Sequence, residues 1–391
     1  MDIKGPALPV SDSSKPLLQR VPALVRAFGI LLVLYVFLAA VKLMGGGFKG
    51  MGKEFADQLI KTTSNPFIGL FVGILVTSVV QSSSLTTSIV VGMVASGTLS
   101  VSCAIPIVMG ANIGTTVTST LVSLGFVTRK EEFRRAFSCA TMHDFFNLLC
   151  VIILLPSELI TRRLFGGAGW MQRTAEAARE IFAGSGETEF ASPVKAALKP
   201  LVHALKELVH MIVGDGTAGA WGQVVLALGL LFFALWAITK LMKSLVLSKL
   251  EAVLDRTIGR NALLGFVFGI LVTAIVQSSS ITTSMLVPLA GAGVMQPYNI
   301  FPITVGANLG TTVTALLAAL GGGPAGLTIA LVHLLFNLMG ALIFVPIPAM
   351  RRIPVGLADR LGSFTLKSRW YAVLYVATVF FAIPCALIFL T

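Results

Sequence analysis

The chain has 391 residues, of which 55% are hydrophobic and only 12% are charged. A soluble globular domain typically carries about 25% charged residues, so this composition excludes that class and favours a polytopic α-helical membrane protein. The net charge of +12 does not indicate a nucleic-acid partner. Its basic residues cluster in short segments between apolar stretches, as the positive-inside rule requires of membrane proteins.

The first half of the chain contains long apolar stretches, two of which have polar interruptions. Residues 1–26 are polar and basic and are expected to form a cytoplasmic tail, and 27–44 is long enough to span a membrane. The stretch 66–99 is interrupted by Gln-Ser-Ser-Ser, and 101–126 by Gly-Ala-Asn-Ile-Gly-Thr-Thr. We expect a re-entrant hairpin and a broken helix at these two places, followed by a third long segment at 136–155.

The middle of the chain, 156–220, is polar and amphipathic, and we expect it to form an extracytoplasmic loop. After this loop the apolar pattern of the first half begins again. The expected segments are a span at 221–242, a hairpin at 261–295, a broken helix at 298–320, a span at 327–349, and a basic cytoplasmic loop with the last span at 350–391.

Two motifs recur at a constant offset of 196 residues. "GILVTSVVQSSSLTTS" at 73–88 matches "GILVTAIVQSSSITTS" at 269–284, and "GANIGTTVT" at 110–118 matches "GANLGTTVT" at 306–314. A single polar run of this kind is usually a helix-packing feature, but two paired motifs at one offset indicate a duplication. We therefore interpret the chain as two repeats, 27–155 and 221–349.

Counting crossings from a cytoplasmic N-terminus inverts the second repeat relative to the first. The basic segments then lie inside, and the charge-balanced 156–220 loop and the C-terminus lie outside, which satisfies the positive-inside rule. The predicted fold class is an all-α polytopic membrane protein with two inverted-topology repeats, each with a re-entrant hairpin and a broken helix. Such repeats are typical of secondary transporters, which bind solute near the bilayer midplane.

The polar runs have the chemistry of a site for an anion and a cation together. Hydroxyl and amide groups both donate and accept hydrogen bonds, and helix N-termini at the hairpin tips suit an anion. Carbonyl and hydroxyl oxygens suit Na⁺. The glycines of the second motif are expected to permit unwinding of the helix; they are Gly110, Gly114, Gly306 and Gly310. The residues by themselves leave the identity of the anion open.

Asp144 is the one carboxylate well inside an apolar segment. Such a residue is costly in a membrane, which favours a functional role as a Na⁺ ligand. The alternative is a structural carboxylate that is hydrogen-bonded to His143 or to a nearby hydroxyl. No second intramembrane acid accompanies Asp144, so an intramembrane hydrolase is disfavoured and we expect no enzymatic activity.

The twin "QSSS" and "GANxGTT" motifs, with "FRRAF" at 133–137, "HDFFN" at 143–147 and "RRIP" at 351–354, resemble the type II sodium-dependent phosphate cotransporters. The resemblance implies symport of inorganic phosphate with Na⁺ as coupling ion and with no cofactor. The phosphate residues that it implies are Gln81, Ser82, Ser83, Ser84, Gln277, Ser278, Ser279 and Ser280. The sodium residues that it implies are Asn112, Thr115, Thr116, Asp144, Asn147, Asn308, Thr311, Thr312 and Asn337.

In that family an aspartate in "HDFFN" accompanies electrogenic transport, so the resemblance implies three Na⁺ per divalent phosphate. It also favours a bacterial member in the cell (inner) membrane, in contact with the lipid bilayer and with no nucleic acid, and a homodimer is left as an open alternative. The rival functions are a Na⁺ symporter for another oxyanion and, in a different class, an ion channel.

Overall fold

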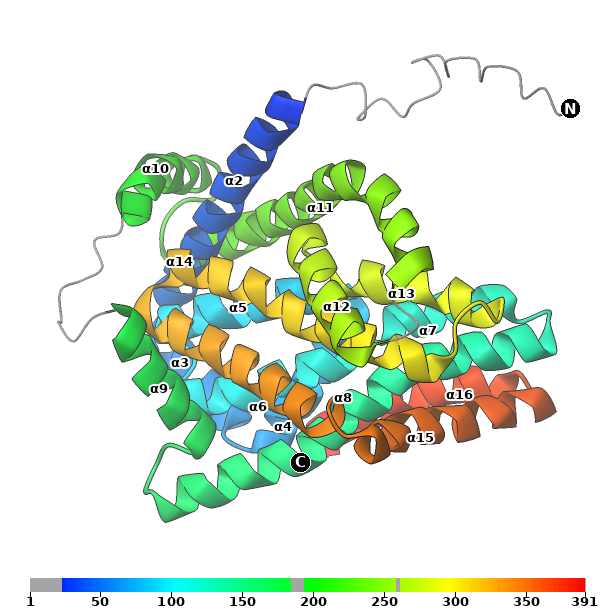
Figure 1. Ribbon diagram of the computed structural model, residues 1–391. Helices are drawn as coiled ribbons and strands as arrows, with labels where there is room; N and C mark the ends of the chain where they lie inside the picture. The colour runs from blue at the N-terminus through cyan, green and yellow to red at the C-terminus, as the bar shows by residue number, and fades with distance from the viewer. Residues whose placement is uncertain (1–22, 184–192, 258–260, 391) are drawn as a thin grey trace, which may run out of the picture.

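The computed structural model describes residues 23–183, 193–257 and 261–390, and within these ranges the regular structure is entirely helical (Figure 1). Most of the expected tail at 1–26 and the middle of the 156–220 loop lie outside the described residues. Six described helices are long and apolar enough to cross a membrane, and a seventh candidate joins two helices that meet at 101°. The expected class of all-α polytopic membrane protein is confirmed.

The first repeat forms a series of helices in which the polar motifs coincide with helix ends. Asn65 caps the first hairpin helix by accepting a hydrogen bond from the Phe67 N–H at 3.0 Å, and Pro66 occupies the first helical position. The elements are α2 (Ala23–Gly50), α3 (Lys53–Thr63), α4 (Pro66–Val80), α5 (Ser83–Ala95), α6 (Val101–Gly114), α7 (Val117–Ser123), the short 3-10 helix η2 (Leu124–Phe126) and α8 (Lys130–Leu164). The hairpin expected at 66–99 thus consists of α4 and α5, with Gln81 and Ser82 between them.

Two amphipathic helices, α9 (Trp170–Ala183) and α10 (Pro193–Val213), account for much of the 156–220 segment. The buried Glu158 carboxylate of α8 accepts hydrogen bonds from the N–H groups of Met171 at 2.7 Å and Gln172 at 3.4 Å. A side chain from another helix thereby caps the start of α9. The second of these helices, α10, is bonded to α2, because the Tyr35 hydroxyl donates to the Ala197 carbonyl at 2.8 Å.

The second repeat differs from the sequence expectation in two places. The helix expected to break within 298–320 is continuous there, and it bends instead at Gly323, which has φ 74° and precedes Pro324. The basic segment after it is a 20-residue helix instead of a loop. The elements are α11 (Gly216–Thr257), α12 (Ala262–Val276), α13 (Ser279–Gly291), α14 (Pro297–Phe344), α15 (Pro348–Lys367), α16 (Trp370–Ala377), the π-helix η3 (Thr378–Ala382) and α17 (Ile383–Leu390).

Glycine serves helix crossing in both repeats, which corrects the expectation of unwinding at Gly110, Gly306 and Gly310, whereas α6 ends at Gly114 as expected. Gly110 and Gly306 lie within continuous helices. A Cβ atom on Gly110 would overlap the carbonyl oxygen of Leu70 in α4, and one on Gly306 would overlap the carbonyl oxygen of Phe266 in α12. The close contact of α4 with α6, and of α12 with α14, therefore requires these glycines.

The two repeats interlock instead of packing as separate bodies. The first spans of the repeats, α2 and α11, pack together, α5 packs against α14, and α13 packs against α7 and α8. Figure 1 shows α15 and α16 alongside α8 at the edge of the molecule. Each hairpin helix that follows a Gln-Ser-Ser-Ser segment therefore contacts the other repeat, and this arrangement determines which side chains meet.

Candidate functional site

The two hairpin tips have the same unusual backbone. Gln81 (φ 55°) and Gln277 (φ 58°) are the non-glycine residues with positive φ among those the structure describes. This left-handed conformation costs roughly 1–2 kcal/mol for an ordinary residue, and such residues concentrate at functional sites. Ser82 and Ser278 follow in extended conformation, and each caps the next helix by accepting a hydrogen bond from the backbone N–H three residues later. Each tip therefore presents a glutamine directly before the N-terminus of a helix.

Matching threonine pairs hold the two arms of each hairpin together. The Thr77 hydroxyl donates to the Thr86 hydroxyl at 2.9 Å, and the Thr273 hydroxyl donates to the Thr282 hydroxyl at 2.9 Å. All four side chains are buried. Sequence reasoning did not single out these residues, although they lie inside the repeated 16-residue motif. They fix the geometry of the tips from within.

The two tips meet at the hydroxyl of Thr314 on α14. This hydroxyl donates to the side-chain oxygen of Gln277 at 2.8 Å, and the Ser84 hydroxyl lies 3.5 Å from it. The structure therefore brings the two Gln-Ser-Ser-Ser segments, 193 or more residues apart in sequence, to one shared side chain. Thr314 is the last residue of the repeated "GANxGTTVT" motif, and this position was the signal that could have identified it.

A second contact between the repeats joins α7 and α13. The hydroxyls of Ser119 on α7 and Thr283 on α13 are 2.8 Å apart. Neither residue was predicted to belong to the site, yet both lie within or directly after the repeated motifs. Each hairpin thus forms a hydroxyl contact with the motif helix of the opposite repeat.

The tips are not equivalent despite their matching sequences. Gln277 is half-buried and bonded to Thr314, and its amide nitrogen donates to the Ala274 carbonyl. Gln81 is exposed, and the buried hydroxyl of Thr118, the counterpart of Thr314 in the first repeat, has no hydrogen-bond partner. The glutamine at the second hairpin tip is therefore hydrogen-bonded, whereas the glutamine at the first tip is exposed.

A buried network of asparagines joins α6, α8 and α14. The Asn308 side-chain nitrogen donates to the side-chain oxygens of Asn147 at 2.8 Å and Asn337 at 2.7 Å. The Asn147 nitrogen donates to the Asn112 carbonyl at 2.8 Å, and the Asn112 side-chain oxygen lies 3.4 Å from the His333 ring nitrogen. The four predicted asparagines are thus brought together: Asn308 bonds to the side chains of two of them, and the amide nitrogens of the other three donate to backbone carbonyls.

Four predicted threonines follow Asn112 or Asn308 within about one turn, two of them in the break between α6 and α7 and two on α14. Their hydroxyls all donate to carbonyl groups of the preceding turn and keep their oxygens as acceptors; they are Thr115, Thr116, Thr311 and Thr312. All four are buried. Hydroxyl and amide oxygens of this kind are the neutral ligands that a hard monovalent cation accepts.

Asp144 on α8 is buried, with 3% of its surface exposed. One carboxylate oxygen accepts a hydrogen bond from the Tyr375 hydroxyl at 3.0 Å, and the other oxygen has no hydrogen-bond partner. Its partner is thus a hydroxyl instead of His143, and no ion pair to it occurs in the described part of the chain. A buried carboxylate with an unpartnered oxygen is a site at which a cation is stabilised.

The structure combines several membrane-spanning candidates with two interlocked hairpins that have polar tips. These features define a polytopic membrane protein and are typical of secondary transporters. The chain belongs to the Na⁺/Pi-cotransporter family, whose model matches residues 36–166 and 230–358. These two matched segments fall largely within the two repeats. The resemblance found in the sequence motifs is therefore confirmed.

Named relatives agree with the family match. Sodium-dependent phosphate transport protein 2A of Ovis aries is 34% identical over 418 residues, which covers 90% of this chain and 65% of the relative. Protein 2B of Homo sapiens is 32% identical over 442 residues, which covers 90% of this chain and 63% of the relative. The chain thus spans slightly less than two thirds of the length of these relatives. They are named as transport proteins, in agreement with the expectation that the chain is not an enzyme. No solved structure matches the chain.

Proposed function

We propose that this chain is a secondary active symporter that imports inorganic phosphate together with Na⁺. The observation that carries the proposal is the meeting of the two polar tips at the Thr314 hydroxyl. The names of the relatives, which describe sodium-dependent phosphate transport, support the choice of solute and coupling ion. No resident cofactor is invoked.

Phosphate is assigned to the tips. The helices α5 and α13 both begin there, and the positive end of a helix dipole favours an anion. The serine hydroxyls supply further donors without a fixed positive charge, so a bound phosphate can also be released. The residues assigned to phosphate are Gln81, Ser82, Ser83, Ser84, Gln277, Ser278, Ser279 and Ser280.

Sodium is assigned to the buried amide, hydroxyl and carboxylate oxygens next to the tips. Na⁺ bound there would replace hydrogen bonds that now join the asparagines, so ion binding and rearrangement of α6, α8 and α14 would be coupled. The residues assigned to sodium are Asn112, Thr115, Thr116, Asp144, Asn147, Asn308, Thr311, Thr312 and Asn337.

Transport is proposed to be electrogenic, with three Na⁺ per divalent phosphate and Asp144 at one Na⁺ site. In the described part of the chain the Asp144 carboxylate forms no ion pair, and one of its oxygens has no hydrogen-bond partner, which supports the assignment. One net charge that crosses the membrane adds about 2.3 kcal/mol of driving force per 100 mV. A membrane potential would therefore increase accumulation well beyond that of a neutral cycle.

The proposed mechanism is alternating access between inverted repeats. The difference between the tips supports it: Gln277 is bonded to the motif helix of its own repeat, while its counterpart Gln81 is exposed and the Thr118 hydroxyl has no hydrogen-bond partner. If the first tip became bonded and the second tip became exposed, the site would open to the other side of the membrane. We place the N-terminus in the cytoplasm and the C-terminus outside, in a cell membrane.

The test is phosphate-evoked current from the protein reconstituted in vesicles at varied Na⁺. We expect a current that requires Na⁺, and in Asp144→Gly we expect loss of the current with some Na⁺-dependent uptake of labelled phosphate remaining. An unchanged current in Asp144→Gly would remove this residue from the coupling role. Arsenate and sulfate are tested as competitors, and stronger uptake of either would favour the rival oxyanion symporter. Failure to accumulate phosphate against its gradient would favour a channel.

A further inference from the structure

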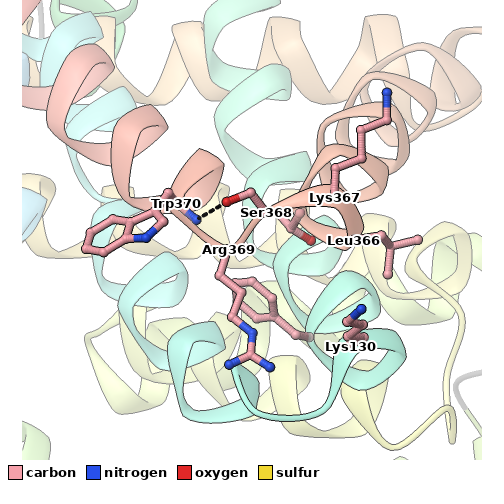
Figure 2. Close-up of a pocket in the computed structure, with 8 residues that line it drawn as sticks. Lys130, Leu366, Lys367, Ser368, Arg369 and Trp370 are labelled. Atoms are coloured by element: carbon pink, nitrogen blue, oxygen red, sulfur yellow. Dashed lines mark hydrogen bonds between the residues drawn. The ribbon is translucent and has the colours of Figure 1, made fainter.

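A cavity of about 330 Å³ lies where α15 ends and where α8 and α16 begin (Figure 2). It is lined by Lys130, Phe133, Thr365, Leu366, Lys367, Ser368, Arg369 and Trp370. None of these residues belongs to either hairpin tip or to the asparagine network. The cavity is thus separate from the residues assigned to phosphate and sodium.

The cavity is positively charged, and no acidic side chain in its lining neutralises this charge. Its lining contains Lys130, Lys367 and Arg369 and no acidic side chain. The nearby acids of α8 are already engaged, because Glu132 pairs with Arg129 at 2.9 Å and Glu131 pairs with Arg134 at 3.0 Å. Three exposed cations around one small cavity therefore have no protein counter-ion there.

The remaining contacts of these cations are weak. An Arg369 guanidinium nitrogen donates to the Thr128 carbonyl at 3.4 Å, and the Lys367 ammonium lies 5.5 Å from the centre of the Phe364 ring. Figure 2 shows Arg369 and Lys130 on the same side of the turn at Ser368, while Lys367 extends from its other side. The Lys130, Lys367 and Arg369 side chains supply charged N–H donors, which suit an anion with several acceptor oxygens.

The position of the cavity identifies the source of that anion. Two candidate membrane spans, Lys130–Leu164 and Trp370–Leu390, begin at the cavity. Trp370 is 76% exposed, and Phe364 and Tyr371 are also exposed beside it. Aromatic side chains gather at the level of lipid headgroups, so the cavity opens where a headgroup phosphate lies.

We propose that this cavity binds the phosphate of an anionic phospholipid headgroup. Basic residues near the end of a span are attracted to anionic lipids, and a cavity of this size is at the lower end of the range for small-molecule sites. The bound lipid holds together the starts of α8 and α16. These two helices also contribute Asp144 and its hydrogen-bond donor Tyr375, so the lipid site stabilises the arrangement around that carboxylate.

The test is native mass spectrometry of the full chain released from nanodiscs of phosphatidylcholine with or without phosphatidylglycerol. The wild type is expected to retain phosphatidylglycerol. The variant Lys130→Gln, Lys367→Gln, Arg369→Gln is expected to bind it about 100-fold more weakly, because each basic residue near an anionic surface contributes roughly a factor of five. The charge-preserving variant Lys130→Arg, Lys367→Arg, Arg369→Lys should retain the lipid.

A matched control removes three exposed cations that do not line the cavity, Lys199, Arg352 and Arg360. This control is expected to retain phosphatidylglycerol as the wild type does. Equal retention by the cavity variant and the wild type would overturn the proposal, and so would equal loss in the control. Displacement of the lipid by an equal concentration of inorganic phosphate would assign the cavity to free phosphate and would also overturn it. Because retention of lipid is measured without transport, these results are independent of the proposed symport.

Discussion

Replacement of Thr314 by valine tests whether its hydroxyl holds the second hairpin tip in place through Gln277. The substitution keeps the shape of the side chain and removes the donor to the Gln277 side-chain oxygen at 2.8 Å. The contact to Ser84 is 3.5 Å long, at the limit of a hydrogen bond, and adds little. The cost is thus mainly that of one bond between helices in a membrane, about 0.6–1.7 kcal/mol of unfolding free energy.

The first repeat supplies a matched control for this experiment. Thr118 occupies the position that corresponds to Thr314, but its buried hydroxyl has no hydrogen-bond partner. Thr118→Val therefore removes a desolvated group without breaking a bond, and it should leave the unfolding free energy unchanged or raise it. The assay is reversible unfolding of each variant in mixed micelles. Equal losses in the two variants, or a larger loss in Thr118→Val, would refute the role of the Thr314 hydroxyl in holding the second tip.

Three further predictions address the helix crossings, the contact between repeats and the buried carboxylate. Gly110→Ala forces a Cβ atom against a backbone carbonyl and should cost about 1–3 kcal/mol, whereas Gly229→Ala, with open space around it, should be neutral or stabilising in thermal unfolding. A double-mutant cycle of Ser119→Ala and Thr283→Val should give a coupling energy of about 0.6–1.7 kcal/mol; zero coupling would contradict the contact. Tyr375→Phe removes the hydroxyl that donates to the Asp144 carboxylate and should lower the apparent Na⁺ affinity in uptake assays; an unchanged affinity would separate this hydroxyl from ion binding.

The hairpins could be predicted from the sequence because their signals are local. Polar residues inside an apolar stretch must be buried in protein or line water, and Asn65, Ser82, Asn261 and Ser278 are good N-caps that fix where helices begin. Because the chain is duplicated, each of these polar runs and N-caps occurs twice. Helix ends at both tips follow from these residues without knowledge of their neighbours.

The errors arose where a residue type has two physical uses that only the packing partner decides. A glycine such as Gly306 suits both an unwound backbone and a close helix crossing, and the carbonyl of Phe266 shows that the second use applies. The basic segment that became α15 was expected to be a loop because of its charge. Its small residues, such as Ala358 and Gly362, are buried, and Gly362 lies against Ser138 of α8. Helix packing thus outweighed the polarity of the segment.

The contacts between repeats could not be predicted because they join residues far apart in the chain. Ser84 and Thr314 are 230 residues apart, and Ser119 and Thr283 are 164 apart. Their hydroxyls have no distinctive local pattern in a segment rich in serine and threonine. The predicted inverted arrangement led to the expectation that the tips converge, but it did not indicate which side chains meet.

The most direct test of the central claim, that both tips form one site, is the protection of single cysteines by substrate. Ser82→Cys and Ser278→Cys are introduced separately into a chain whose native cysteines are replaced, and each is labelled with a thiol reagent in reconstituted vesicles. Phosphate with Na⁺ should slow labelling at both positions, and neither solute alone should do so to the same extent. Protection of one cysteine without the other would contradict a shared site.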